Sequence, residues 1–306
     1  TAAYQHSELQ SDQDYPFVRS VDKTFQDFLP SVLLTGNPDP RRSIRLQYQT
    51  STTSPSISQL QNVVDNSNPL ALTSGNPQLR QTYNQTVTLR LSDTDPMKSK
   101  SKFAFMNFTR TAHPIANTTF TAATDTTIDG IALARGTQLT RPDNLDASYN
   151  ANAFAVYSRP TKWLKSIMNV NGGATWSRTP TLVNGRVNRS DSYALRAGAV
   201  LASNISPNLD FTVTYFATWN IAHNSITTSS AGNYFSHVAG LRFNAVVGPK
   251  FVIREEVNNN LTSGVPGQYG QNTVLWNSTV GKKFLKDDKI EIRVTATDVL
   301  GQDRSV

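Results

Sequence analysis

The chain of 306 residues contains no cysteine, which excludes disulfide bonds, thiolate nucleophiles and cysteine metal sites. No apolar run approaches the roughly 20 residues of a transmembrane helix, so a helical membrane protein is excluded. That absence does not bear on β-barrels, whose strands carry a weaker signal. Only 38% of the residues are hydrophobic, and Asn, Thr and Ser fill most of what is neither apolar nor charged. This balance is compatible with strands that have one solvated face.

Basic clusters are also missing, although the formal net charge is +7 and the sequence pI is about 9.6. Lys and Arg are scattered singly, and no cluster is longer than Arg41-Arg42 or Lys282-Lys283. A nucleic-acid-binding surface needs a concentrated basic patch. We therefore expect no nucleic-acid partner.

Signatures of catalysis and of cofactor binding are absent as well. The four histidines lie far apart without metal-ligand spacing, and the sequence has no nucleophile elbow, phosphate-cradling loop or nucleotide fingerprint. Arg254, Glu255 and Glu256 are adjacent, but neighbouring residues of a strand face opposite ways, so the two acids cannot act as a pair. We expect no enzymatic activity, no metal and no cofactor.

The clearest pattern in the chain is the alternation from Leu209 to Asn220. Apolar side chains fall on one parity and polar ones on the other, with Phe216 as the exception. Successive side chains of a strand point to opposite faces, so this segment has one apolar and one polar face. Its length of about 11 residues suits a tilted strand that crosses a bilayer. A strand of a soluble sandwich alternates in the same way, so the segment alone leaves both alternatives open.

Similar extended segments recur along the chain and predict about 13 strands and no clear helix. They are residues 2–9, 24–35, 43–50, 82–92, 102–120, 147–158, 167–177, 193–201, 209–220, 235–247, 251–259, 273–284 and 290–297.

The connections between these segments alternate in length. Short turns are expected at 36–42, 93–101, 159–166, 202–208, 248–250 and 285–289, and longer polar loops at 10–23, 51–81, 121–145, 178–191, 223–233 and 261–272. In an up-and-down sheet every second connection lies at the same end. The pattern therefore places all short turns at one end and all long loops at the other, as in outer-membrane barrels. A soluble sandwich has no reason to separate loops by length.

The chemistry of the two strand faces favours the same fold. Aromatic residues such as Trp176, Trp219 and Phe251 fall near both margins of the apolar face, as interfacial girdles do. Arg45, Arg90, Arg196, Arg242, Arg254, Glu256, Glu291 and Arg293 fall on the opposite parity. We predict an all-β protein, an up-and-down antiparallel transmembrane β-barrel with these charged residues inside.

Several short motifs resemble a known family. They are Phe25-Gln26-Asp27-Phe28-Leu29-Pro30-Ser31, Pro55-Ser56-Ile57-Ser58-Gln59-Leu60-Gln61, Asn68-Pro69-Leu70, Gly75-Asn76-Pro77-Gln78-Leu79-Arg80, Gly281-Lys282-Lys283-Phe284-Leu285 and Asp298-Val299-Leu300-Gly301-Gln302. With these motifs the whole chain resembles the C-terminal barrel region of Bacteroidetes-type outer-membrane β-barrel proteins related to TonB-dependent receptors. The resemblance implies a bacterial outer-membrane location and transport of a substrate.

The chain departs from that family in two ways. The plug, the early strands and the last strand of the family's barrel are not in residues 1–306. An open wall of about 13 strands leaves two raw edges, which lipid does not tolerate. We therefore expect the chain to be the C-terminal part of a larger barrel of roughly 22 strands, the size that holds a plugged lumen.

Contact with a substrate or a surface partner is expected in the two longest loops, and the candidate residues there are Gln59, Asn76, Arg80, Arg135 and Arg141. The expected partners are outer-membrane lipid, the missing barrel and plug segments, and a surface lipoprotein or other envelope subunits. Two alternatives to transport stay open. One is a structural or assembly subunit of an outer-membrane complex, and the other is a secreted, soluble β-rich adhesin.

Overall fold

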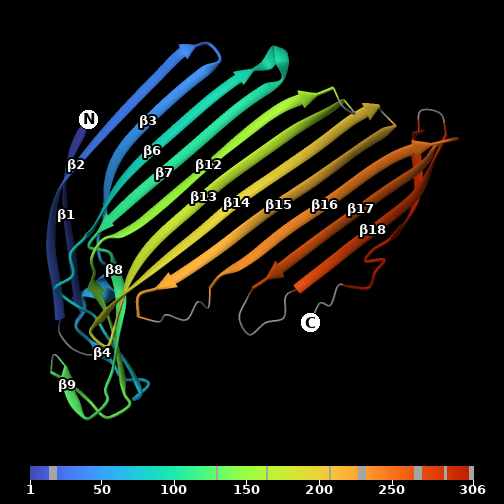
Figure 1. The fold of residues 1–306 in the computed structure, drawn as a ribbon. Coiled ribbons are helices and arrows are strands. Elements are labelled where there is room, and N and C mark those ends of the chain that lie inside the picture. Colours follow the sequence, from blue (N-terminus) through green and yellow to red (C-terminus); the bar gives the residue numbers. More distant parts are fainter. Residues whose placement is uncertain are drawn as a thin grey trace.

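Long antiparallel strands lie side by side in one continuous wall (Figure 1). The computed structural model describes residues 1–13, 19–128, 130–162, 165–206, 208–226, 232–264, 271–285 and 288–302. Seventeen strands of this part of the chain form one sheet. Four of them belong to the long connections, namely β4 Val64–Asp65, β5 Ala71–Ser74, β8 Ile115–Thr121 and β11 Gln138–Asn144, which leaves thirteen in the wall. That number confirms the expected count.

The wall strands follow one another in chain order, and each pairs antiparallel with the next. They are β1 Ala2–Gln13, β2 Arg19–Asp39, β3 Arg42–Thr53, β6 Thr82–Asp95, β7 Lys100–Ala112, β12 Ser148–Thr161, β13 Ser166–Val183, β14 Arg186–Ser206, β15 Leu209–Asn224, β16 Tyr234–Val247, β17 Phe251–Ser263, β18 Gln271–Phe284 and β19 Ile290–Ala296. This is the predicted up-and-down sheet.

The two edges of the wall are β1 and β19, and within the described residues these strands do not pair with each other. Strand β2 changes partners at Pro30. Its pairing with β1 ends at Ala2 opposite Pro30, and its pairing with β3 begins at Ser31 opposite Gln49. Proline lacks a backbone N–H and so cannot donate a hydrogen bond to a neighbouring strand, and Pro30 is the point where β2 passes from one neighbour to the other.

The short turns lie together at one end of the wall, the upper end in Figure 1. Residues Pro96–Lys98 form a 3-10 turn between β6 and β7, and Gly248 and Lys250, both with positive φ, make the turn between β16 and β17. The expected separation of short and long connections is confirmed at this end.

The prediction of a long loop at 178–191 is wrong. Strands β13 and β14 continue through it as far as Val183 and Arg186, and only Asn184 and Gly185 form the turn. Both have positive φ, 49° and 73°. Asn-Gly is the preferred pair for a two-residue hairpin of this geometry, so a local signal was present in the sequence. The many polar residues of the segment favoured a loop instead.

In three other segments the structure also differs from the prediction. Strands β1 and β2 extend into 10–23, of which residues 14–18 lie outside the described part. The strand expected over 102–120 breaks at His113, whose φ is 52°, and Pro114, giving β7 and the separate strand β8 Ile115–Thr121. One short α-helix, α1 Ile57–Leu60, lies in the connection expected to be without structure. No helix of the described chain is long and apolar enough to span a membrane.

Register fixes the two faces of the wall, because residues opposite each other on paired strands point to the same side. One row runs through the apolar side chains Leu46, Leu89, Met106, Ala153, Ala174, Leu195, Trp219 and Phe235. Leu241 is 43% exposed and Ile292 is 63% exposed, so these apolar side chains do not meet in a dry interior. We call this side the apolar face and the opposite side the polar face.

The polar face carries the charged side chains that the alternation predicted. Arg242 binds Glu256 at 3.2 Å, and Arg254 binds Glu291 at 2.8 Å. Both pairs bridge strands on the same side of the wall. The segregation of charge is confirmed for these four residues.

The segregation of charge is not complete, because some carboxylates lie on the apolar face. Glu255 lies on the apolar face opposite Ser278, and it accepts hydrogen bonds from Trp276 Nε1 at 2.7 Å and from the Ser278 hydroxyl at 2.8 Å. These two donors satisfy the carboxylate, which an apolar surrounding would otherwise destabilise. Glu255 and Glu256 indeed face opposite sides and do not act together.

Aromatic side chains gather at both margins of the apolar face. At the long-loop margin Tyr149 stacks on Trp176 at 6.0 Å between ring centroids, and Arg178 lies 5.7 Å above the Trp176 ring. At the short-turn margin Lys282 Nζ lies 4.9 Å from the centre of the Phe251 ring. A cation held beside rings at the edge of an apolar band is typical of an interfacial position.

An ion-pair cluster ties two short turns together, and it should respond to acid. Asp288 binds Lys250 Nζ at 2.7 Å and Lys283 Nζ at 3.7 Å. The hydrogen bond from Lys250 lowers the pKa of the Asp288 carboxyl below its ordinary value of 3.8. A lowered pKa means that the stabilisation is complete at neutral pH and is lost as the pH falls through the lowered value.

We therefore expect the hydrogen-exchange protection factors of residues 248–250, 283–285 and 288–289 to fall in acid but to stay constant between pH 5 and 8, because protection factors are already corrected for the intrinsic exchange rate at each pH. Asp288→Asn should show the lowered protection factors already at pH 7. Wild-type protection in this variant would contradict the role of the carboxylate.

Candidate functional site: the long-loop module

The two longest connections fold together into one unit at the long-loop end of the wall, at the lower left in Figure 1. Residues 54–81 contribute α1, β4 Val64–Asp65 and β5 Ala71–Ser74. Residues 113–147 contribute β8, β9 Thr126–Ile128, β10 Ile131–Leu133 and β11 Gln138–Asn144. We call this unit the long-loop module. The two segments predicted only as long polar loops, 51–81 and 121–145, therefore contain regular secondary structure.

Strand β11 joins the two loops. It pairs antiparallel with β8 from its own loop and parallel with β5 from the other loop, where Leu139 lies opposite Leu72. A parallel pair between segments so distant in sequence needs packing to hold it. That packing comes from Leu72, Ala122, Leu133 and Leu139, which are at most 8% exposed.

Hydrogen bonds between the loops reinforce this core. Asn76 donates from its side-chain amide to the carbonyl of Pro142 at 3.2 Å. Asn144 accepts from the backbone N–H of Arg80 at 2.6 Å and donates back to the Arg80 carbonyl at 3.1 Å. These bonds form a seam along which residues 76–80 and 141–144 run together.

The module is fastened to the wall at two places. The turn residue Asn184 donates its backbone N–H to Thr119 at 3.0 Å, and its side chain accepts from the N–H of Thr121 at 2.8 Å. On the other side the amide of Gln81 donates to the hydroxyls of Ser7 and Ser54 at 3.1 and 2.9 Å. The extension of β13 and β14 beyond the other strands brings the Asn184 turn within hydrogen-bonding distance of β8.

The motif Gly75-Asn76-Pro77 has a clear physical role. Gly75 is buried, and a Cβ at this position would meet the Gln61 carbonyl and lie 2.8 Å from the Gln59 oxygen. The Asn76 N–H donates to that same Gln59 oxygen at 2.6 Å. Only glycine lets the two backbones approach this closely.

The five candidate contact residues are thus partly brought together. Asn76, Arg80 and Arg141 lie along the seam, and Gln59 adjoins it through its backbone. Arg135 lies apart, in the turn after β10, where its N–H donates to the Asp125 carboxylate at 2.8 Å.

Their side chains differ in what they can offer a partner. Gln59 uses its side chain to cap α1, since its Oε1 accepts from the Ser56 N–H at 2.9 Å, and Asn76 uses its own in the seam. The side chains of Arg80 and Arg135 are exposed. Contact with a partner stays a prediction for all five, and these two arginines are the best placed for it.

Comparison of the sequence with known protein families identifies the family that has this architecture. The outer membrane protein beta-barrel family matches residues 4–306. The chain belongs to this family. No curated protein matches the chain.

This outer membrane barrel protein therefore resides in the bacterial outer membrane, as the alternation and loop lengths predicted. The apolar face of the wall is its membrane side, and the polar face is its lumen side. By the rule for such barrels the short turns are periplasmic and the long-loop module is extracellular. Within the described residues no three His, Asp or Glu side chains lie close enough to share a metal ion.

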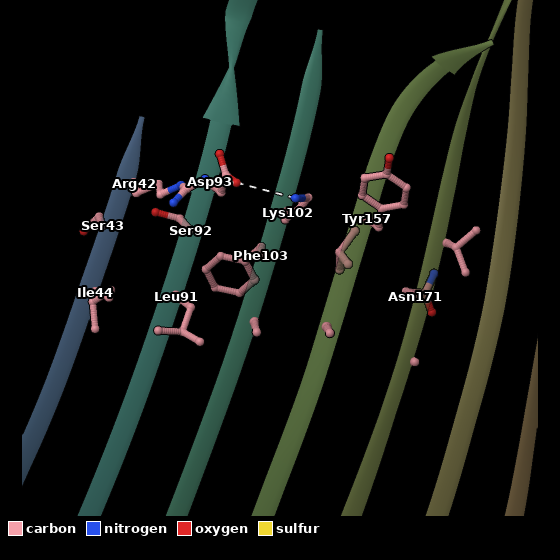
Figure 2. A pocket seen from close by; sticks show the side chains of 15 residues that line it. Arg42, Ser43, Ile44, Leu91, Ser92, Asp93, Lys102, Phe103, Tyr157 and Asn171 are labelled. Atoms are coloured by element: carbon pink, nitrogen blue, oxygen red, sulfur yellow. Dashed lines mark ion pairs between the residues drawn. The ribbon is translucent and has the colours of Figure 1, made fainter. Parts of the chain in front are cut away.

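A hollow on the membrane side lies close to the short-turn end (Figure 2). Its volume is about 780 Å³, and a second hollow of about 400 Å³ adjoins it. The small residues Ala104, Ala155 and Gly172 are common to both. At its upper border Lys102 lies 3.6 Å from Asp93, which also contacts Arg42 at 3.7 Å.

Proposed function

We propose that this barrel protein forms the wall of an outer-membrane transporter resembling a TonB-dependent receptor, and that its long-loop module contacts the incoming substrate or a surface partner. The observation that carries this proposal is the fixed module. Its core, and its hydrogen bonds to Asn184 and Ser7 of the wall, hold the backbone that carries the exposed side chains of Arg80 and Arg135. Binding groups on a rigid support lose less entropy when they bind.

The proposal includes further segments of a larger barrel. The unpaired edges of β1 and β19 expose backbone donors and acceptors that must be satisfied within a bilayer. Additional strands would close the wall into a barrel of roughly 22 strands in total, the number found in barrels with a plugged lumen. We further propose that phospholipid acyl chains fill the hollow over Ala104, Ala155 and Gly172.

A structural or assembly subunit is the alternative within the same membrane. A secreted soluble protein is inconsistent with the outer-membrane location. Energised uptake distinguishes transport from a structural role, because only a transporter needs the energy-coupled plug.

The test compares cells with and without the complete gene for uptake of labelled oligosaccharides, peptides and metal chelates. Transport predicts that at least one solute depends on the gene and that an uncoupler abolishes its uptake. Arg80→Ser with Arg135→Ser should lower that uptake about tenfold, whereas Lys98→Ser with Lys100→Ser, two exposed cations at the opposite end, should not. Unchanged uptake of every solute together with loss of an envelope complex would establish the structural role instead.

A further inference from the structure

Three arginines and two phenylalanines share one row on the lumen side of the wall. Arg45 lies opposite Arg90, and Arg90 lies opposite Phe105. The row continues from Phe105 to Phe154 and through Gly173 to Arg196. We call these six residues the luminal Arg–Phe row. Their order places two cations at one end, an aromatic surface in the middle and a third cation at the other end.

The cations of this row have no anionic partner among the described residues. Arg45 donates only a long hydrogen bond of 3.5 Å to Gln47, and Arg90 lies 5.7 Å above the ring of Phe105. All three arginines are exposed. The contrast is with Arg242 and Arg254 on the same side, each of which binds a glutamate.

The pairing of Arg45 with Arg90 is itself informative. Side chains directly opposite on antiparallel strands have Cβ atoms about 5 Å apart, and like charges in that position destabilise the sheet. A bound oxyanion would remove the repulsion, because each guanidinium can donate two parallel hydrogen bonds to it. The cross-strand arginines thus place two guanidinium groups where a single oxyanion could accept hydrogen bonds from both.

The aromatic part of the row lies next to polar side chains on this side of the wall, such as Thr88, Asn107 and Asn152. Phe154 lies 5.4 Å from Phe105 and 5.6 Å from Phe103 between ring centroids, yet it is still 40% exposed. Gly173 leaves room beside it, since a Cβ there would lie 3.1 Å from the Phe154 Cβ. The cluster presents an apolar surface directly beside the arginines.

We propose that the luminal Arg–Phe row binds an oxyanion, a phosphate or a carboxylate, that carries an apolar or aromatic group. Arg45 and Arg90 bind the oxyanion, and Phe105 and Phe154 pack against the apolar group. Arg196 adds a positive field from the far side of the row. The same oxyanion chemistry could come from a dissolved solute or from an acidic side chain of another barrel segment inside the lumen.

This inference deepens the proposed transport function by naming a class of solute, but it can be tested by binding alone. If binding is found and uptake is not, the site stands and the transport proposal falls. If uptake is found and binding is not, the transport proposal stands and the binding site is rejected.

The probes are phenyl phosphate, inorganic phosphate and benzyl alcohol, titrated calorimetrically against the full-length protein in nanodiscs with empty nanodiscs as the blank. Phenyl phosphate should bind at least tenfold more tightly than either of the other two. Arg45→Gln or Arg90→Gln should weaken phenyl phosphate about tenfold, and the effect should shrink at high salt. Phe154→Leu should weaken phenyl phosphate severalfold while leaving inorganic phosphate unchanged.

Arg242→Gln is the matched control, because it removes an arginine from the same side of the wall that already has a carboxylate partner. It should leave phenyl phosphate binding unchanged. Equal weakening by this control, or wild-type affinity in both Arg45 and Arg90 variants, would overturn the proposal. A protein that binds no phenyl phosphate but is destabilised by Arg90→Gln would also overturn it, in favour of an internal carboxylate as the occupant.

Discussion

Leu241→Arg is expected to lower the free energy of unfolding of the inserted barrel by about 2–4 kcal/mol, the range for a cation near the bilayer midplane on the lipid side of a barrel. Leu241 lies in the middle of β16 on the membrane side, opposite Val213 and Val257. The measurement is a urea titration of the full-length protein in phospholipid vesicles.

Val238→Arg is the matched control for that experiment. Val238 is on the same strand and is equally exposed, at 44% against 43%, but it lies on the lumen side, opposite Phe216. An arginine there is solvated, so we expect a change below about 1 kcal/mol. Equal destabilisation by both variants would show that the two faces do not differ in the way the register implies.

Gly75→Ala is expected to disorder the long-loop module while leaving the wall assembled. The added Cβ would collide with the backbone oxygens of Gln61 and Gln59, which cannot move aside as a flexible side chain could. Overpacking against backbone destabilises a protein by about 1–3 kcal/mol. Much of the stability of a small module would be lost, so extracellular protease should cleave residues 54–81 and 113–147 in intact cells.

Gly36→Ala is the control for this prediction, because a Cβ at Gly36 meets no atom within 4 Å. Its protease pattern should match that of the wild type. Wild-type resistance in Gly75→Ala would contradict the role given to this glycine. Failure of Gly75→Ala to assemble in the membrane would show that the wall depends on the module.

The wall could be predicted from the sequence because its strands are regular. Each of the strands β14 to β16 has water on one side and an apolar surrounding on the other. The alternation of polar and apolar residues in its sequence therefore shows which side chains lie on each face. Register then follows from chain order, since nearly every strand pairs with the next one along. The Asn184-Gly185 turn was also readable, yet the polar residues around it favoured a loop.

The long-loop module could not be predicted in the same way. Its core consists of single leucines, Leu72, Leu133 and Leu139, spaced too irregularly to indicate a helix or a strand. The parallel pair of β5 and β11 joins residues more than 60 positions apart, and nothing local in either segment specifies its partner. For the same reason the side chains of Gln59 and Asn76 could be expected to reach a partner, although the structure uses them internally.

The luminal Arg–Phe row is an intermediate case. Parity alone placed Arg45, Arg90 and Arg196 on the polar side, and the structure agrees. That Arg45 faces Arg90, and that Phe105 and Phe154 complete their row, depends on the pairing of β3, β6, β7 and β12 across the two long connections. Register across such connections is not encoded by any turn.

The central claim, an apolar membrane side and a polar lumen side, can be measured directly because the chain has no native cysteine. Single cysteines at each position from 235 to 247 would carry a nitroxide label in the full-length protein in vesicles. Collision rates with oxygen, which concentrates in lipid, and with a water-soluble nickel chelate should alternate with a period of two. Odd positions such as Leu241 should favour oxygen, and even positions such as Arg242 should favour nickel. Rates without this alternation, or odd positions shielded from both reagents, would contradict the account.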